Sequence, residues 1–348
     1  MLEVLDEIAD ALGKRFEEPG VKAVVIPHLN PDGDAAGASS ALFQAMRYKG
    51  VDVKILVPDG FPEYLMWLNG LDEAVSCKMQ PELCRKLLKS ARIIFMIDHN
   101  TAKREGELEV LRRMSGAEVV MIDHHPFPEE ADYRISDTTA SSTCELMYDF
   151  IRKLWGKDCI NADMANALYT GINTDTGGFS HNSSNPHTYR IVADLLELGL
   201  DKDKVHDYIY RMNKLSRLRL IGYLLARKLE ILPGYPLALT SVTGEELRAY
   251  GYREGDLEGF VNTPLSVKEI LVSVLVTERE GNVRLSFRSK GNLPVNKWAN
   301  EYFNGGGHLS AAGGRVEESL CEVVDRLKRT APWFFNEICK TGEILLDL

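Results

Sequence analysis

Four short apolar runs in the first third of the chain constrain its fold more than any other feature. They are rich in Val and Ile and occupy residues 22–27, 51–57, 92–97 and 117–122. Nearly continuous apolar runs of this length are typical of strands that are covered on both faces. Stretches with helical spacing separate them, at residues 34–49, 81–90 and 105–114. This alternation predicts an α/β domain with a parallel sheet and right-handed crossovers.

The rest of the chain predicts a smaller α+β domain joined through helices. Helices are expected at 139–154 and 162–172, and the pattern stays helical from 185 to the LPGYP segment at 232–236. Strands are then expected in PLALTSV, KEILVSVLVTE and VRLSFRS, followed by helices near 295–302 and 317–329. We therefore predict a first domain over 1–190, a helical connector over 191–235 and a second domain over 236–348, as the length of 348 residues allows.

Composition excludes several classes of protein. Lys and Arg number 41 against 51 Asp and Glu, a net charge of −10, which argues against a broad grip on long nucleic acid such as a duplex. The sequence contains no run of about 18 apolar residues, so it predicts no membrane span. The N-terminus has the pattern of an acidic amphipathic helix and not of a signal peptide, and we therefore expect a cytoplasmic protein. The six cysteines form no CxxC pair, and we expect reduced core thiols.

Histidine is concentrated in a few polar segments. Five of the eight histidines lie in HLNPDGD (28–34), DHN (98–100), DHH (123–125) and GGGH (305–308). The first three segments each begin where a predicted parallel strand ends. Because ligands of open α/β sheets bind outside the carboxyl ends of the strands, we expect these side chains to converge in one crevice.

The converging groups predict a metal site. They comprise five carboxylates and three imidazoles: His28, Asp32, Asp34, Asp98, Asp123, His124, His125 and, from TDTGG, Asp175. One Asp at a strand end is often only a turn former or a helix cap, but five carboxylates in one crevice would repel one another without cations. Ligation by carboxylate and imidazole without thiolate favours Mn²⁺, with Mg²⁺, Co²⁺ or Fe²⁺ as alternatives. The number of ligands suits two ions, which lie about 3.5–4 Å apart in such sites.

Five ordered motifs resemble those of the DHH phosphoesterase superfamily. HLNPDGDAAGAS, MIDHN, MIDHHPFP and TDTGGFS resemble its four catalytic motifs, and GGGHLSAAGG resembles the glycine-rich motif of the associated C-terminal domain. The length is similar to that of the branch of short-oligonucleotide ribonucleases and pAp phosphatases. RecJ exonucleases are larger, and family II pyrophosphatases have a different second domain.

The resemblance implies roles for individual residues. His28 and Asp32 would bind one metal, Asp34, His124 and Asp175 would bind the other, and Asp98 would bridge both. Asp123 would hold His124 in the correct tautomer, and His125 would face the substrate or the bridging water, so that Asp123 and His125 act in catalysis. His99, which follows Asp98, leaves open which histidine lies nearest the metals.

The second domain is expected to bind phosphate. Gly305, Gly306 and Gly307 allow backbone N–H groups to form an anion nest, and His308 adds a donor. Arg288 resembles the substrate-binding arginine of the family, and we include the adjacent Ser289. Arg284 has the same side-chain parity as Arg288, and whether it joins Arg288 or is a solvated charge stays open.

We therefore expect a phosphoesterase with its active site in a cleft between the domains. Hydroxide activated by two metals would hydrolyse very short oligoribonucleotides to mononucleotides, or pAp to AMP. The alternatives are hydrolysis of pApA or cyclic di-AMP, hydrolysis of polyphosphate or pyrophosphate, and a non-catalytic nucleotide sensor. Phe179 and His181, which follow TDTGG, are open to base stacking, and a homodimer is left open.

Overall fold

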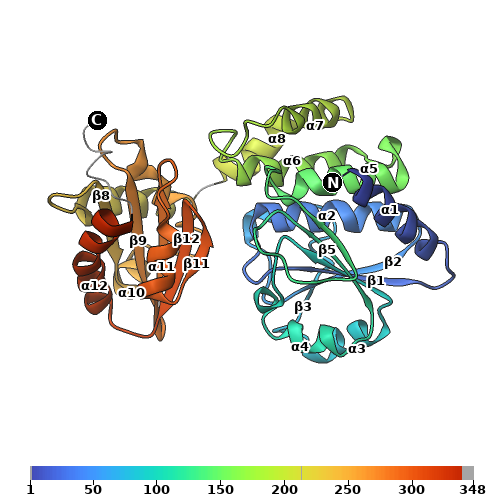
Figure 1. Ribbon diagram of the computed structural model, residues 1–348, viewed down its shortest axis with the longest axis horizontal. Coiled ribbons are helices and arrows are strands. Elements are labelled where there is room, and N and C mark those ends of the chain that lie inside the picture. The colour runs from blue at the N-terminus through green and yellow to red at the C-terminus, as the bar shows by residue number, and fades with distance from the viewer. Residues whose placement is uncertain (1, 213, 339–348) are drawn as a thin grey trace. The chain divides into compact units, whose positions relative to one another are not determined.

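The computed structural model describes residues 2–212 and 214–338, and the chain divides into two compact units, Met1–Met212 and Asn213–Leu348. The residues predicted as a connector, 191–235, are shared between the two units. The units are described separately below (Figure 1).

The first unit is built on a parallel sheet of six strands, which confirms the predicted fold class. The strand order is β3-β2-β1-β4-β5-β6, and every neighbouring pair is parallel. The four predicted strands are present within one residue, and two short strands, β3 and β6, were not predicted. The strands are β1 (Lys22–Pro27), β2 (Asp52–Val57), β3 (Val75–Ser76), β4 (Ile93–Ile97), β5 (Glu118–Asp123) and β6 (Tyr133–Ser136).

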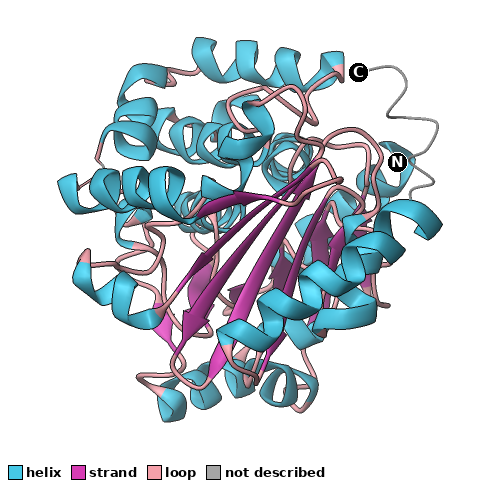
Figure 2. Cartoon of the chain, turned by 90° about the vertical axis from the view of Figure 1, so that its left-hand side faces the viewer, coloured by secondary structure: helices cyan, strands magenta, loops and turns pink. Residues whose placement is uncertain are grey.

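Helices cover both faces of this sheet (Figures 1 and 2). Helices α3 and α4 lie on one face, and α1, α2, α5 and α6 lie on the other, where the larger apolar core forms. The helices are α1 (Leu2–Phe16), α2 (Gly33–Tyr48), α3 (Pro81–Ser90), α4 (Leu108–Arg113), α5 (Thr143–Trp155), α6 (Ala162–Asp175), α7 (Pro186–Glu197) and α8 (Lys202–His206). Short helical turns are η1 (Glu63–Leu65), η2 (Ala102–Glu105), η3 (Lys157–Cys159) and the π-helix η4 (Asp207–Arg211).

The second unit is α+β with a mixed sheet, as predicted. Its strand order is β11-β12-β10-β9-β8-β7, in which β8 and β9 pair in parallel and the other neighbours are antiparallel. The strands are β7 (Leu229–Ile231), β8 (Leu237–Val242), β9 (Val272–Arg279), β10 (Asn282–Ser289), β11 (Gly306–His308) and β12 (Ala311–Val316). The helices are α9 (Leu215–Tyr223), η5 (Leu224–Lys228), α10 (Gly244–Ala249), η6 (Phe260–Ser266), α11 (Val295–Phe303), α12 (Leu320–Pro332) and η7 (Trp333–Ile338).

Two expectations need correction. The helical pattern up to residue 232 ends earlier, because residues 229–231 form strand β7 against β8. The expectation of reduced core thiols is wrong for three cysteines: Cys77 and Cys84 form a disulfide between β3 and α3, and Cys321 is exposed. Cys144 and Cys159 are buried and free as expected, and Cys339 lies outside the described residues.

Within residues 2–212 and 214–338, no helix combines the length and the apolar character needed to cross a membrane.

Glycine lets α2 and α6 approach closely enough to bring their functional ends together. A Cβ atom at Gly37 on α2 would overlap the carbonyl oxygen of Ala167 on α6. Asp34 lies in the first turn of α2 and Asp175 is the last residue of α6. The close approach of the two helices therefore helps to place these two carboxylates in one site.

This packing predicts opposite effects for two Gly→Ala substitutions in helices. Gly222 on α9 is exposed, and a Cβ there meets open space, so Gly222→Ala should raise the free energy of unfolding by up to about 1 kcal/mol through helix propensity. Gly37→Ala gains the same propensity but must push α2 away from α6, and overpacking costs about 1–3 kcal/mol. Urea unfolding of both variants measures this, and equal effects of the two substitutions would contradict the packing argument.

Candidate metal centre

The carboxyl ends of β1, β4 and β5 bring most of the sequence-predicted residues together in the first unit. His28 follows β1, Asp98 follows β4, and Asp123 ends β5 just before His124 and His125. His28, Asp34, Asp98, Asp123 and His124 are all buried. The convergence expected from the parallel topology is therefore present.

Two groups of imidazole and carboxylate share Asp98. His28 Nε2 lies 3.5 Å from Asp98 Oδ2 and 3.9 Å from Asp32 Oδ1. His124 Nε2 lies 3.8 Å from Asp98 Oδ1, 3.9 Å from Asp34 Oδ2 and 3.5 Å from Asp175 Oδ2. The donor atoms of His28, Asp32 and Asp98, and those of Asp34, Asp98 and His124, are close enough for each group to hold a metal ion.

The two histidines are oriented in the same way. The Nδ1 atom of His28 lies 2.9 Å from the Leu29 carbonyl oxygen, and that of His124 lies 3.4 Å from the Ala140 carbonyl oxygen. An Nδ1–H that donates to a carbonyl leaves Nε2 with its lone pair, which in each ring faces the carboxylates. The Nε2 atom of His28 is buried without a hydrogen-bond partner. A cation between these donors would satisfy it, so the residues present fit a metal ion.

The first turn of α5 donates hydrogen bonds to the carboxylates of Asp34 and Asp98. Asp34 accepts hydrogen bonds from the backbone N–H groups of Thr143 and Cys144, at 2.6 and 2.9 Å. The Thr143 hydroxyl also donates to Asp98 Oδ1 at 2.8 Å. Orphan N–H groups at a helix N-terminus favour negative charge. Sequence reasoning missed Thr143. The signal that could have found it is the Ser142-x-x-Glu145 spacing, which marks the start of α5, where the Ser142 side chain is the N-cap.

Asp32 fulfils the helix-capping role that the sequence also allowed. Its Oδ1 atom accepts from the backbone N–H groups of Asp34 and Ala35, at 3.0 and 3.2 Å, at the start of α2. The same oxygen faces His28. Capping therefore fixes the carboxylate toward the cluster, and the two interpretations are compatible.

The titration behaviour reflects the crowding of charge. Burial, and then the negative charges of Asp98 and Asp175, raise the pKa of Asp34 well above its usual value. Burial alone would raise the pKa of Asp98, but the neighbouring His28, His125 and His124 outweigh it and lower the pKa. Burial opposes protonation of His28, yet the carboxylates of Asp32 and Asp98 raise its pKa to about 10. Positive charge is thus favoured between these side chains, whether a proton or a metal ion supplies it.

Asp123 orients a different histidine from the one expected. Its Oδ1 atom lies 2.7 Å from His125 Nδ1, and its Oδ2 atom accepts from the His125 backbone N–H at 3.0 Å. The role of holding His124 falls instead to the Ala140 carbonyl. His125 remains beside the cluster, since its Nδ1 atom also lies 3.7 Å from Asp98 Oδ1.

Arg104 is a cation of the site that sequence reasoning missed. Its Nη1 atom lies 3.2 Å from His125 Nε2, on the side of the ring opposite Asp123. It comes from the turn η2, and its backbone oxygen accepts from the Leu29 N–H at 2.7 Å, which ties η2 to the segment after β1. No spacing in the sequence points to Arg104, because the two partners are 21 residues apart.

His99 is directed away from the cluster, which answers the question that the sequence left open. It is fully buried, with Nδ1 at 2.9 Å from the Ile97 carbonyl oxygen and Nε2 at 3.2 Å from Glu105. Glu105 in turn accepts from Arg112 at 2.8 Å. Of the two histidines that flank the strand ends here, His28 and not His99 therefore faces the carboxylates.

In the second unit, Arg288 and His308 lie on one face of the sheet. Arg288 on β10 and His308 on β11 are both in register with Ala311 of β12, which lies between them. Side chains in register across neighbouring strands point to the same face. Ser289, the next residue, faces the other way, and its hydroxyl donates to the Leu293 carbonyl at 2.8 Å. Arg284 is paired with Glu254 at 3.0 Å, which favours the solvated-charge alternative.

The glycine run serves strand packing, and its strand geometry lends no support to the expected anion nest. Residues 306–308 form strand β11, so successive N–H groups alternate in direction instead of pointing into one concavity. A Cβ at Gly305 would overlap the Gly313 carbonyl oxygen, and one at Gly307 would press on the backbone of β12. At Gly306 a side chain would meet open space.

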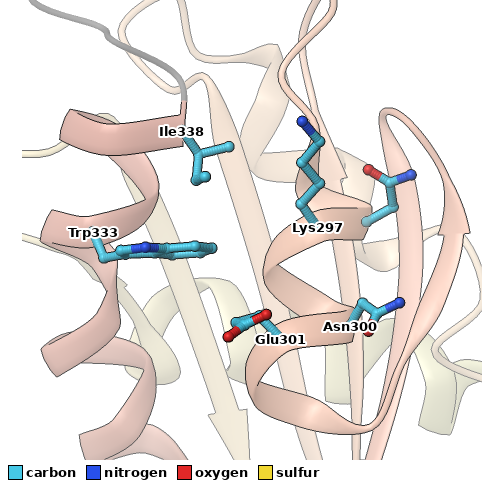
Figure 3. Close-up of a pocket in the computed structure, with 6 residues that line it drawn as sticks. Lys297, Asn300, Glu301, Trp333 and Ile338 are labelled. Carbon is cyan, nitrogen blue, oxygen red and sulfur yellow. The ribbon is translucent and has the colours of Figure 1, made fainter.

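The second unit also has a hollow that the sequence did not predict (Figure 3). It has a volume of about 300 Å³, and Trp333 and Ile338 of η7 face α11 across it. The α11 residues that line it are Asn296, Lys297, Asn300 and Glu301. Asn296 Nδ2 also donates to the Gly307 carbonyl at 3.4 Å, so the hollow borders strand β11.

With this geometry in place, comparison with known proteins gives the family. Residues 22–172 match the DHH family, N-terminal domain, and residues 239–332 match the DHHA1 domain. A solved structure of an exopolyphosphatase-related protein from Bacteroides fragilis is 37% identical, covers 94% of this chain and 97% of its own, and superposes with a TM-score of 0.88. The chain belongs to the DHH family.

Other relatives share nearly the whole length of this DHH-family protein. The bifunctional oligoribonuclease and PAP phosphatase NrnA of Bacillus subtilis is 28% identical over 83% of this chain and 87% of its own, and that of Thermus thermophilus is also 28% identical, over 84% and 83%. RecJ of Thermus thermophilus in complex with Mn²⁺ shares the fold, with a TM-score of 0.58 at 14% identity over 94% of this chain and 54% of RecJ. The NrnA relatives and the family match support a hydrolase, and the likeness to RecJ shows the shared fold.

Asp98 belongs to both imidazole–carboxylate groups, so we predict that its carboxylate is needed for metal binding. Saturating Mn²⁺ should stabilise the wild-type protein, by about 2.7 kcal/mol at 100 times Kd, and should hardly stabilise Asp98→Asn. Asp149→Asn is the matched control, since Asp149 is a carboxylate of the same unit that pairs with His187 at 2.7 Å outside the cluster. Calorimetry and thermal melting with and without Mn²⁺ measure the effect, and unchanged Mn²⁺ binding by Asp98→Asn would contradict the assignment.

Proposed function

We propose that this protein is a metal-dependent phosphoesterase that hydrolyses very short oligoribonucleotides to mononucleotides, pAp to AMP, or both. The observation that carries the proposal is the pair of imidazole–carboxylate groups joined through Asp98. The names of the NrnA relatives support the substrate class.

In this proposal His28 and Asp32 hold one divalent ion, Asp34, His124 and Asp175 hold a second, and Asp98 contacts both. Oxygen and imidazole donors without thiolate favour Mn²⁺, with Mg²⁺ or Co²⁺ as alternatives. When bound, two such ions would lower the pKa of a water molecule, so that hydroxide is available near neutral pH, and would offset negative charge on the phosphoryl oxygens. The buried His28 Nε2 is the atom that most needs such a partner.

His125, Asp123 and Arg104 act on the substrate side of the cluster. Asp123 accepts the Nδ1 proton of His125, which places the Nε2 lone pair toward Arg104. A guanidinium has five N–H donors in a planar fork, so Arg104 can contact His125 and a phosphate oxygen together. In this proposal the positive charge of Arg104 holds the scissile phosphate, and His125 fixes the position of the Arg104 guanidinium.

Arg288 and His308 hold the distal end of the substrate. They share one face of the second unit's sheet, on strands separated by β12, so their backbones are about 10 Å apart. Gly306, two residues before His308 on β11, offers backbone without a side chain. Separate sites for the scissile and the distal phosphate would select substrates by length, which favours dinucleotides and pAp over long RNA. Of the other residues predicted to bind substrate, Ser289, Gly305 and Gly307 have structural roles here.

Hydrolysis of a linear phosphate chain is the second candidate. The description of the Bacteroides fragilis relative as exopolyphosphatase-related favours it. Such a substrate needs the metal ions and cations but offers no base. Hydrolysis of pApA or cyclic di-AMP and a non-catalytic sensor remain alternatives from the sequence.

A hydrolysis panel with Mn²⁺ tests the substrate class. We expect kcat/KM to fall steadily from 2- to 24-nucleotide RNA, because an acidic protein gains little from additional phosphates and a two-point site excludes a long chain. The panel includes pAp, pApA, cyclic di-AMP, pyrophosphate and polyphosphate. Equal kcat/KM on 2-mers and 24-mers would contradict selection by length, preference for polyphosphate would favour the second candidate, and no turnover on any substrate would leave the sensor.

Two arginines on the same strand test the role of the second unit. Arg288→Ala and His308→Ala should lower kcat/KM for pAp about 10- to 150-fold, since each removes a hydrogen bond of roughly 1.5–3 kcal/mol to phosphate. Arg284→Ala, with the same strand and parity but an ion pair to Glu254, should have little effect.

Hydrolysis of bis-p-nitrophenyl phosphate, which has no distal phosphate, provides the reference activity for these variants. If Arg288→Ala lowered this activity and that on pAp by the same factor, the second unit would act on the chemical step or on folding. The proposed division between cleavage and holding would then be wrong.

A further inference from the structure

Backbone strain in the described residues is concentrated in the motif segments. Six non-glycine residues have φ in the left-handed region: Asn30, Asp98, Phe127, Phe179, Asn182 and Asn304. All lie in or directly beside the segments that carry the proposed chemistry. Asn and Asp tolerate this conformation because their short polar side chains bond locally, but phenylalanine does not.

The two phenylalanines differ in what surrounds them. Phe179 is half-buried and packs against Tyr169 and Tyr189, with ring centroids 6.1 and 5.6 Å away. Packing therefore explains Phe179, and the base-stacking role that the sequence left open for it is unnecessary. Phe127 has φ of 59° and is 90% exposed. Its ring gains almost nothing from burial, although its backbone carries the strain.

The strained conformation of Phe127 is imposed by the loop around it. The Asn100 side chain donates to the Pro126 carbonyl at 2.6 Å, and the Glu129 backbone N–H donates to the Asn100 carbonyl at 2.8 Å. The Glu129 carboxylate accepts in turn from the Ala102 N–H at 3.2 Å. The loop after β5 is thus fastened on both sides of Phe127 to the segment that follows Asp98. A conformation held in this way persists because its surroundings over-determine it.

The position of Phe127 is at the edge of the candidate metal centre. It follows His125 by two residues, so their Cα atoms are at most about 7 Å apart. His125 Nδ1 lies 3.7 Å from Asp98 Oδ1. Glu129, Glu130 and Asp132 are the charged residues between Phe127 and β6, so this part of the loop has no attraction for phosphate. What it presents beside the cluster is an aromatic face.

We propose that Phe127 is a specificity-determining residue that stacks on the nucleobase next to the scissile phosphate. The inference rests on the proposed function and adds the base as a recognised part of the substrate. A phenyl ring offers only its π-face, so it would accept any base and discriminate against substrates that have none. The strained, exposed ring is then explained as a preformed platform whose contact is completed by the ligand.

The test compares substrates with and without a base. Stacking on one base corresponds to about 5- to 150-fold in kcat/KM, and Phe127→Ala should lose this factor on a dinucleotide. Phe127→Trp should retain activity, whereas Phe127→Leu, which is apolar but not aromatic, should not. Two further dinucleotides each lack one base, on one or the other side of the phosphate. When the missing base is the one that the ring contacts, the wild type and Phe127→Ala should cleave the dinucleotide at equal rates. Tyr48→Ala removes another exposed aromatic ring, on α2, and serves as the control.

Three results would overturn the proposal. They are unchanged kcat/KM in Phe127→Ala, full activity in Phe127→Leu, and equal loss on intact dinucleotides and both abasic substrates. Failure of the proposed function is a separate outcome, in which the wild type hydrolyses no nucleotide substrate. Calorimetry of AMP binding in the presence of Mn²⁺ would then decide the stacking: weaker binding by Phe127→Ala supports it, and equal binding overturns it.

Discussion

The mutual repulsion of closely packed carboxylates is the constraint on which the rest of the first unit depends. Asp34 and Asp98 are 1% and 2% exposed, and the negative charge of Asp175 acts on Asp34. Burying such charges without partners costs several kcal/mol per ion. The fold opposes this cost with backbone N–H groups at the start of α5, with the Thr143 hydroxyl, and with the imidazoles of His28 and His124. A divalent cation bound between these carboxylates and imidazoles would reduce the repulsion further.

The backbone around Asp98 separates two environments that are adjacent in sequence. With φ of 61°, Asp98 leaves β4 in the left-handed region and presents its carboxylate to the cluster. His99 is fixed in a buried network with Glu105 and Arg112. The left-handed conformation of one residue thus lets a single turn supply both a carboxylate of the cluster and an anchor for η2, which carries Arg104. Strain stored in this way is typical of functional sites.

The second unit uses glycine and strand register to build a different kind of surface. Close approach of β11 to β12 requires glycine at 305 and 307, and the pairing then places Arg288 and His308 in one row. In the proposed function, a chain with a net charge of −10 would bind phosphate through a few cations at defined positions, without a broad positive field. This local mode agrees with a small substrate.

The sequence by itself determined most of the element types, the two-part organisation and most of the residues that converge. The four main strands could be predicted within one residue, because apolar periodicity is a local property, and the members of the cluster followed from the rule that parallel strands end at one edge. Only the tertiary structure decided which partner each side chain takes: His125 for Asp123, Arg104 for His125, and the α5 N-terminus for Asp34. Asp123 and His125 are only two residues apart, but the direction of the turn between them depends on the rest of the fold. The partners in the other two pairs are 21 or more residues apart in the sequence. The two-residue β3 and the four-residue β6 were likewise decided by their neighbours, because the pairing of short strands depends on the sheet they join more than on their own propensity.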